Sequence, residues 1–190
     1  LARRPGHHHV AVMQHVFIDV EAMGPPGMGR PFALGAAKFD LERGVFDRWS
    51  GLIKPCGEAD ADTMAWLSSQ TPDVLAQLRG RSSFWNVWDS FLAWVYGNIL
   101  ALPSERPTTF YADDWADFAW IDFECRTAKR PPLRTFGPQY DTSLIIALVP
   151  ADRRPRRNPD WIQHVAVDDA AAGALEFIHA LKFLGRGLPC

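Results

Sequence analysis

Cysteine is scarce in this sequence. The three cysteines, Cys56, Cys125 and Cys190, stand far apart without paired spacing. Disulfide frameworks need several cysteines at short intervals, and structural zinc sites need cysteine or histidine in close pairs. The sequence therefore argues against both kinds of site. It favours a reducing compartment, and we expect a cytoplasmic protein.

Long apolar runs and an excess of charge of one sign are also missing. No apolar stretch approaches the roughly 20 residues that a membrane-spanning helix needs, so we expect no membrane partner. Twenty basic and 22 acidic residues give a formal net charge of −2, so no overall basic field indicates a nucleic-acid partner. A chain can still be basic along one groove alone, so this balance does not exclude such a partner.

The length of 190 residues is enough for one domain with a sizeable core. Residues 1–14 contain His7–His9 and no apolar signal core, and we expect a disordered arm or a remnant of cloning there. A single domain is expected over residues 15–186. The chain stops abruptly at Pro189-Cys190, and whether it is truncated there stays open.

The pattern predicts an α/β fold. An apolar run from Val16, followed by alternating segments at 31–41 and 45–54 with a short turn at 42–44, predicts three antiparallel strands. Helical periodicity then begins after Asp62, with further helices expected after Thr71 and Ser83. A short strand is expected at 108–112, followed by a helix to about Lys129. Residues 142–149 fit either a strand or a helix, with a helix preferred, and a long helix closes the chain.

Two acidic residues interrupt the run at 16–24, Val-Phe-Ile-Asp-Val-Glu-Ala-Met-Gly. Residues two apart in a strand share a face, so Asp19 and Glu21 should lie side by side at the strand end. Two such carboxylates repel each other and lose hydration unless a cation such as Mg²⁺ or Mn²⁺ lies between them. The alternative is that both simply reach solvent beyond the strand.

More acidic residues follow the strand expected at 108–112. Asp113, Asp114 and Asp117 stand where this strand ends and a helix begins. They could hold a metal ion, or they could cap the helix and favour its dipole. Near the last helix, His164 precedes Asp169 by five residues, a pair that capping and solvent exposure alone could also explain.

Taken together, these residues resemble the DEDDh 3′–5′ exonucleases of the ribonuclease-H-like fold. The first motif is Asp19-x-Glu21 followed by Met23-Gly24, and Leu34-Gly35-Ala36 resembles the signature of the next strand. The last motif, residues 164–170, reads His-Val-Ala-Val-Asp-Asp-Ala, close to the family's His-x-Ala-x-x-Asp-Ala. Residues 62–70 are similar to the subgroup that contains exonuclease VIII and its phage relatives. The resemblance implies a mixed sheet with its first three strands antiparallel and helices on both faces.

The middle motif departs from the family pattern. The family has an asparagine four residues before its acidic residue and an aromatic residue just before it. Here Asp113 holds the asparagine position and Ala116 the aromatic one. We assign Asp117 as the third acidic residue, with Asp114 as the rival assignment.

The resemblance implies hydrolysis of phosphodiester bonds with two divalent ions, Mg²⁺ or Mn²⁺, about 4 Å apart. Asp19 would bridge the ions, Glu21 and Asp169 would complete the site of the attacking water, and Asp117 would hold the second ion. His164 would be the general base, a role that suits a group titrating near neutral pH.

The resemblance also implies contacts with single-stranded 3′ ends of RNA or DNA. Ala22, Met23 and Gly24 would meet the terminal nucleotide, and Trp115 or Trp161 could stack on a base. The basic run that begins with Arg153 and Arg154 could hold phosphates, or it could be an ordinary solvated loop. A homodimer stays open. The alternatives are a ribonuclease-H-like module that binds nucleic acid or protein without cleavage, and a hydrolase of short oligonucleotides.

Overall fold

The structure is a computed structural model that describes residues 13–25, 29–56, 59, 61–97 and 107–188. Most of the arm expected at 1–14, including His7–His9, lies outside these residues, as does Cys190. The first strand begins at Gln14, one residue before the domain boundary expected from the sequence.

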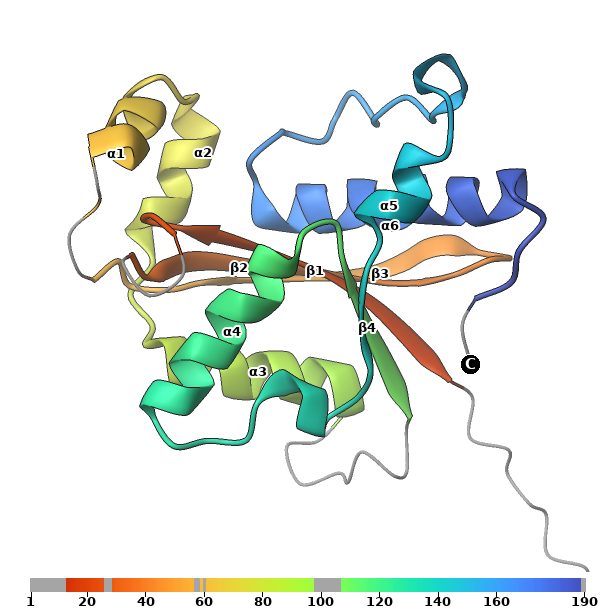
Figure 1. The fold of residues 1–190 in the computed structure, drawn as a ribbon. Coiled ribbons are helices and arrows are strands. Elements are labelled where there is room, and N and C mark those ends of the chain that lie inside the picture. The colour runs from red at the N-terminus through yellow and green to blue at the C-terminus, as the bar shows by residue number, and fades with distance from the viewer. Residues whose placement is uncertain (1–12, 26–28, 57–58, 60, 98–106, 189–190) are drawn as a thin grey trace, which may run out of the picture.

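The strands form one mixed sheet in the order β3-β2-β1-β4-β5 (Figure 1). β1 pairs antiparallel with β2, and β2 with β3, whereas β4 runs parallel to β1 and β5 parallel to β4. The predicted antiparallel arrangement of the first three strands is therefore confirmed. The fifth strand was not predicted. The strands are β1 (Gln14–Ala22), β2 (Pro31–Asp40), β3 (Gly44–Leu52), β4 (Thr108–Ala112) and β5 (Gln139–Asp141).

Helices cover both faces of the sheet (Figure 1). One layer contains α3 (Phe84–Tyr96) and α4 (Trp115–Thr127), and the opposite layer contains α5 (Ser143–Ala147) and α6 (Ala166–Phe183). At one end of the sheet lie α1 (Ala61–Ser68), α2 (Pro72–Ala76) and the 3₁₀ turn η1 (Gln77–Arg79). Two more 3₁₀ turns are η2 (Leu133–Thr135) and η3 (Ala151–Arg153). None of the helices described is long and apolar enough to cross a membrane.

Successive side chains of β1 point to opposite faces of the sheet and pack into two separate core clusters. Val16 and Ile18 are fully buried in the cluster formed with α3 and α4. Phe17 is buried in the cluster formed with α6. Asp19 and Glu21 continue the side of the strand that carries Phe17, so both carboxylates emerge toward α6.

Local capping explains where several helices begin. The Oγ of Ser83 accepts a hydrogen bond from the Asn86 amide at 3.2 Å, and Oδ1 of Asp114 accepts one from the Ala116 amide at 2.9 Å. Oδ1 of Asp141 accepts one from the Ser143 amide at 2.8 Å, which favours a helix in the segment whose pattern was ambiguous. The helix expected to begin after Asp62, with Asp62 as its N-cap, instead starts at Ala61, so Asp62 lies within the first turn of α1 and the expected cap is wrong.

A glycine lets α6 approach the sheet. Gly35 pairs with Asp19 across β1 and β2. A Cβ atom added at Gly35 would overlap the backbone of Ala166 and Val167, where α6 begins. The start of α6 therefore lies directly on β2, beside the strand that carries Asp19.

Candidate active site

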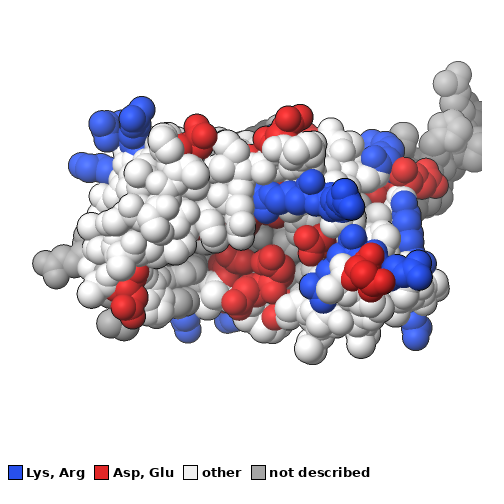
Figure 2. Space-filling view, turned by 90° about the horizontal axis from the view of Figure 1, so that it is seen from above, with Lys and Arg blue, Asp and Glu red and all other residues white. Residues whose placement is uncertain are grey.

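The acidic side chains meet at the carboxyl end of β1. They line a cavity of about 360 Å³. Figure 2 shows Asp and Glu side chains gathered in a hollow on this face, with Lys and Arg side chains beside it. The charged and titratable residues that line the cavity are Asp19, Glu21, Asp113, Arg157, His164, Asp169 and Glu176.

Within this site the possible metal ligands form two groups. One contains a carboxylate oxygen each from Asp19, Asp113 and Asp117, all within 4.8 Å of one another. In the other, ligand atoms of Glu21, His164 and Asp169 lie within the same distance of one another. The structure thus brings all five residues proposed for catalysis to one place, and it adds Asp113 to them.

Asp117 is fixed against the strand that carries Asp19. It is buried in the first turn of α4, and its Oδ1 accepts a hydrogen bond from the Val20 amide at 2.9 Å. Asp114 is exposed and caps the same helix. Of the two residues considered for the third acidic position, Asp117 lies in the acidic cluster. Asp114 instead accepts a hydrogen bond from a backbone amide at the start of α4.

Burial and mutual repulsion raise the pKa values of these carboxyl groups. Burial, followed by the nearby charges of Asp117, Glu21, Asp169 and Asp113, holds the pKa of Asp19 well above its usual range. Burial and then Asp169 raise the pKa of Glu21 to about 8. Burial also raises the pKa of Asp117 to about 8, although the bond from the Val20 amide opposes this. The cluster therefore favours bound positive charge, as protons or as a cation.

The residues present fit divalent cations. Carboxylate oxygens are the ligands that hard cations prefer, and an imidazole nitrogen is available beside them. Oδ2 of Asp19 is buried and has no hydrogen-bond partner among the residues that the structure describes. A bound cation would satisfy this atom and would relieve the repulsion that the raised pKa values report.

This electrostatic strain predicts that stability without metal falls as pH rises. Between about pH 4.5 and 8 the folded protein holds a proton on Glu21 that the unfolded chain has lost, so the free energy of unfolding decreases with pH. We expect Glu21→Gln to unfold at a higher temperature than the wild type near pH 8, and at about the same temperature near pH 4.5. Thermal unfolding in a chelator measures this difference.

Burial lowers the pKa of His15, so His15 makes the protein more stable as pH rises, opposite to the effect of Glu21. Both the wild type and Glu21→Gln contain His15, so the difference between them reports the Glu21 carboxyl. Added Mn²⁺ should remove most of the difference near pH 8 by stabilising the wild type. A variant that is no more stable than the wild type at high pH would contradict the strained cluster.

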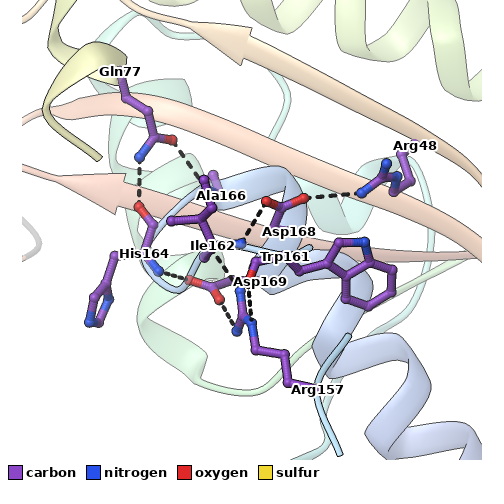
Figure 3. A network of polar contacts seen from close by, with 9 residues as sticks. All are labelled: Arg48, Gln77, Arg157, Trp161, Ile162, His164, Ala166, Asp168 and Asp169. Carbon is purple, nitrogen blue, oxygen red and sulfur yellow. Dashed lines mark hydrogen bonds and ion pairs between the residues drawn. The ribbon is translucent and has the colours of Figure 1, made fainter. Parts of the chain in front are cut away.

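The segment that carries His164 is held by the acidic residues of α6 (Figure 3). The His164 amide donates to Oδ2 of Asp169 at 2.7 Å, and Arg157 forms an ion pair with Oδ1 of the same carboxylate. Oδ2 of Asp168 accepts from the Ile162 amide at 2.9 Å, and its Oδ1 lies 3.0 Å from Arg48. Asp169 therefore faces the cavity. Asp168 holds the segment that carries His164 through its hydrogen bond with the Ile162 amide.

The residues expected to contact substrate are more scattered. Ala22 and Gly24 line a groove of about 860 Å³ beside the cavity, together with Trp66 and Trp120. Met23 packs against the small cluster that includes Ala166. Trp115 is 54% exposed, at the start of α4.

The two arginines predicted to bind phosphate do not line the cavity. Arg153 lies 3.7 Å from Asp152, and Nε of Arg154 donates to the Val149 carbonyl at 3.1 Å. Arg157, from the same basic run, is the arginine that reaches the cavity. The sequence showed only that several arginines follow one another here, and it could not indicate which of them points into the cavity.

Comparisons with known proteins agree with this arrangement. A family model described as a 3′-5′ exoribonuclease Rv2179c-like domain matches residues 14–178. Among solved structures, Exonuclease X in complex with 5′ overhanging duplex DNA is 16% identical, with a TM-score of 0.56. The match covers 90% of this chain and 93% of that one, and it shows a shared ribonuclease-H-like fold. No curated protein sequence matches the chain. The chain belongs to the Rv2179c-like 3′–5′ exoribonuclease domain family, within the DEDDh exonuclease superfamily, and is a 3′–5′ exonuclease.

Proposed function

We infer that this protein removes nucleotides from the 3′ ends of single-stranded nucleic acid, with RNA as the first candidate substrate and DNA as the second. The observation that carries this inference is the pair of ligand groups, Asp19–Asp113–Asp117 and Glu21–His164–Asp169, that share one end of β1. The exoribonuclease description of the matching family supports RNA. The exonuclease VIII subgroup remains a prediction.

Four carboxylates would hold two divalent ions, Mg²⁺ or Mn²⁺. Asp19, Glu21, Asp117 and Asp169 are the proposed ligands, and Asp113 lies close enough to Asp19 and Asp117 to contribute. When bound, the ions supply a nucleophilic water and neutralise charge on the attacked phosphate and the leaving oxygen. The chain itself brings the proposed ligands from β1, α4 and α6 close together.

His164 is the proposed general base. Its ring is in the same ligand group as Glu21 and Asp169, and its edge meets Trp66 with ring centres 5.1 Å apart. A base so placed accepts the proton of the attacking water. Arg157 is positively charged beside Asp169, and we assign it the contact with the scissile phosphate.

The groove beside the cavity is the proposed site of the terminal nucleotide. Ala22 and Gly24 line this groove, and their small side chains leave room for a sugar. Met23, between these two residues in the sequence, packs against the cluster that contains Ala166. Trp115 lies exposed at the start of α4, where a base could stack on it. Arg153 and Arg154 would then contact phosphates farther along the strand.

The His164→Ala variant is expected to lose about 10²- to 10⁴-fold in kcat, the usual contribution of a positioned general base. Its affinity for Mn²⁺ should change much less, because the four carboxylates remain. Single-turnover cleavage across a range of pH, together with calorimetric titration of Mn²⁺, checks both statements. A variant with unchanged kcat and an unchanged pH profile would remove His164 from the mechanism.

The direct test is digestion of single-stranded RNA and DNA labelled at either end, with Mg²⁺, Mn²⁺ or a chelator. Metal-dependent shortening from the 3′ end is expected, faster on RNA than on DNA. Binding without cleavage at any ion concentration would favour the non-cleaving module, and cleavage of dinucleotides alone would favour the oligonucleotide hydrolase.

Two further expectations accompany this proposal. We place the enzyme in the cytoplasm, because the cysteines described, Cys56 and Cys125, are free. Homodimer formation is the remaining expectation, and light scattering of the purified protein tests it.

A further inference from the structure

We propose that Gln77 is a positioning residue that holds the His164 segment in its active conformation. Gln77 belongs to η1, far from β1 and α6 in the sequence, and it is buried. Its Nε2 donates to the His164 carbonyl at 2.6 Å, and its Oε1 accepts from the Ala166 amide at 3.1 Å (Figure 3). One side-chain amide thus closes a pair of hydrogen bonds with the backbone directly after His164.

The backbone at His164 needs such support. Its φ angle is +63°, in the left-handed region that residues with a side chain rarely adopt. The bond from its amide to Asp169 fixes the peptide group before it, and Gln77 fixes the peptide group after it. With both neighbouring peptide groups held, the Cα–Cβ direction of His164 is set, and the ring points into the cavity.

The turn that carries Gln77 is itself anchored to the sheet. A Cβ added at Gly80 would overlap the backbone of Ile53, and the Lys54 amide donates to the Ser82 carbonyl at 2.7 Å. Leu67 and Leu78 pack with Ala166 in one small cluster. Trp66, from the same stretch, touches the His164 ring edge-on. The stretch from α1 to η1 therefore contacts both the backbone and the ring of His164.

A side-chain amide carries both the donor and the acceptor that these two hydrogen bonds need, and an ionised carboxylate carries acceptors alone. A glutamate could accept from Ala166 but would bring a carboxylate against the His164 carbonyl. An alanine makes neither bond, and a methionine fills the same space without a donor. Buried polar groups left without partners at His164 and Ala166 would then favour another backbone conformation.

This inference rests on the proposed function, in which His164 is the base. For Gln77→Ala we expect kcat to fall about 10- to 100-fold, as when outer partners of site ligands are removed. KM and the Mn²⁺ dissociation constant should change by less than about threefold. Gln77→Glu should not restore kcat. The matched control is Gln70→Ala, because the hydrogen bonds that the Gln70 amide makes to described residues stay at the end of its own helix, at Trp66 and Ser69.

A double-mutant cycle separates positioning from general destabilisation. If Gln77 acts through His164, adding Gln77→Ala to His164→Ala should lower kcat no further, so the two losses should not add. The C2 proton of His164, assigned by its loss in His164→Ala, should broaden or shift in Gln77→Ala and not in Gln70→Ala. If Gln77→Ala fails to fold, Gln77→Met serves in its place.

The outcomes are distinct. Wild-type protein that cleaves no polymer would overturn the proposed function, and the His164 resonance would still decide whether Gln77 holds the segment. Active wild type with additive losses in the cycle, or with an unchanged resonance in Gln77→Ala, would overturn the positioning role. An active His164→Ala variant would overturn it as well.

Discussion

Replacement of Asp19 by asparagine should reduce kcat/KM by about 10³-fold or more and should also make the metal-free protein more stable. Metal ions supply several kcal/mol of transition-state stabilisation, and each loss of about 1.4 kcal/mol is a factor of ten in rate. Asp19 belongs to the first ligand group, and its buried Oδ2 has no hydrogen-bond partner in the described part of the chain. Asparagine keeps the shape, removes one negative charge and weakens the site for a cation.

The stability gain follows from the same repulsion. Asp19 lies among the charges of Asp117, Glu21 and Asp169, which hold its pKa high together with burial. Near neutral pH the neutral amide avoids this cost, so the variant should unfold at a higher temperature than the wild type in a chelator. With saturating Mn²⁺ the order should reverse, because only the wild type gains the full free energy of ion binding.

Asp160→Asn is the matched control for this pair of measurements. It removes the same charge from an exposed position that does not line the cavity, and it should leave rate and unfolding temperature near their wild-type values. An Asp19→Asn enzyme that retains most of its rate, or that is less stable than the wild type in chelator, would contradict the metal-ligand assignment.

Replacement of Gly35 by alanine should cost both stability and activity. The added Cβ would overlap the backbone at the start of α6, and main chain relaxes less readily than a flexible side chain. Overpacking of this kind costs about 1–3 kcal/mol, which for a chain of this size corresponds to a fall in Tm of roughly 2–12 °C. Because Asp169 and His164 move with the start of α6, the rate should fall well beyond the loss expected from unfolding alone.

Gly187→Ala provides the control, since a Cβ at Gly187 meets no atom within 4 Å. Unfolding temperature and single-turnover cleavage well below Tm should both match the wild type in that variant. Full activity in Gly35→Ala at a temperature where the protein is folded would show that the distance between β2 and α6 does not control the site.

Periodicity and motif spacing were enough to predict the parts of the fold that are continuous in sequence. The strand with Asp19 and Glu21, the short strand at 108–112 and the long closing helix all follow from local patterns, and the structure confirms them. The strand β5 has only three residues, and it pairs with β4 in a segment interrupted by proline and glycine. No period can be read from three residues, so only the pairing partner defines this strand.

The same limit applies to the site. Asp19, Glu21 and Asp169 were recognisable because each stands in a short motif. Gln77 is separated from His164 by 87 positions, and no local pattern marks it. Asp113 stands where the family has an asparagine, so the sequence did not mark it as a ligand. Only the structure, through the turn between β4 and α4, shows that it lies close to Asp19 and Asp117.

The proposed ligands are spread along the chain, and their order matters while the protein is being synthesised on the ribosome. Asp19 and Glu21 emerge first, Asp117 follows in α4, and His164 and Asp169 come last, one just before α6 and the other in its first turn. Domains fold as units once enough of the chain has emerged. On the proposed assignment, the general base and one metal ligand would therefore be missing until nearly all of the described chain has left the exit tunnel.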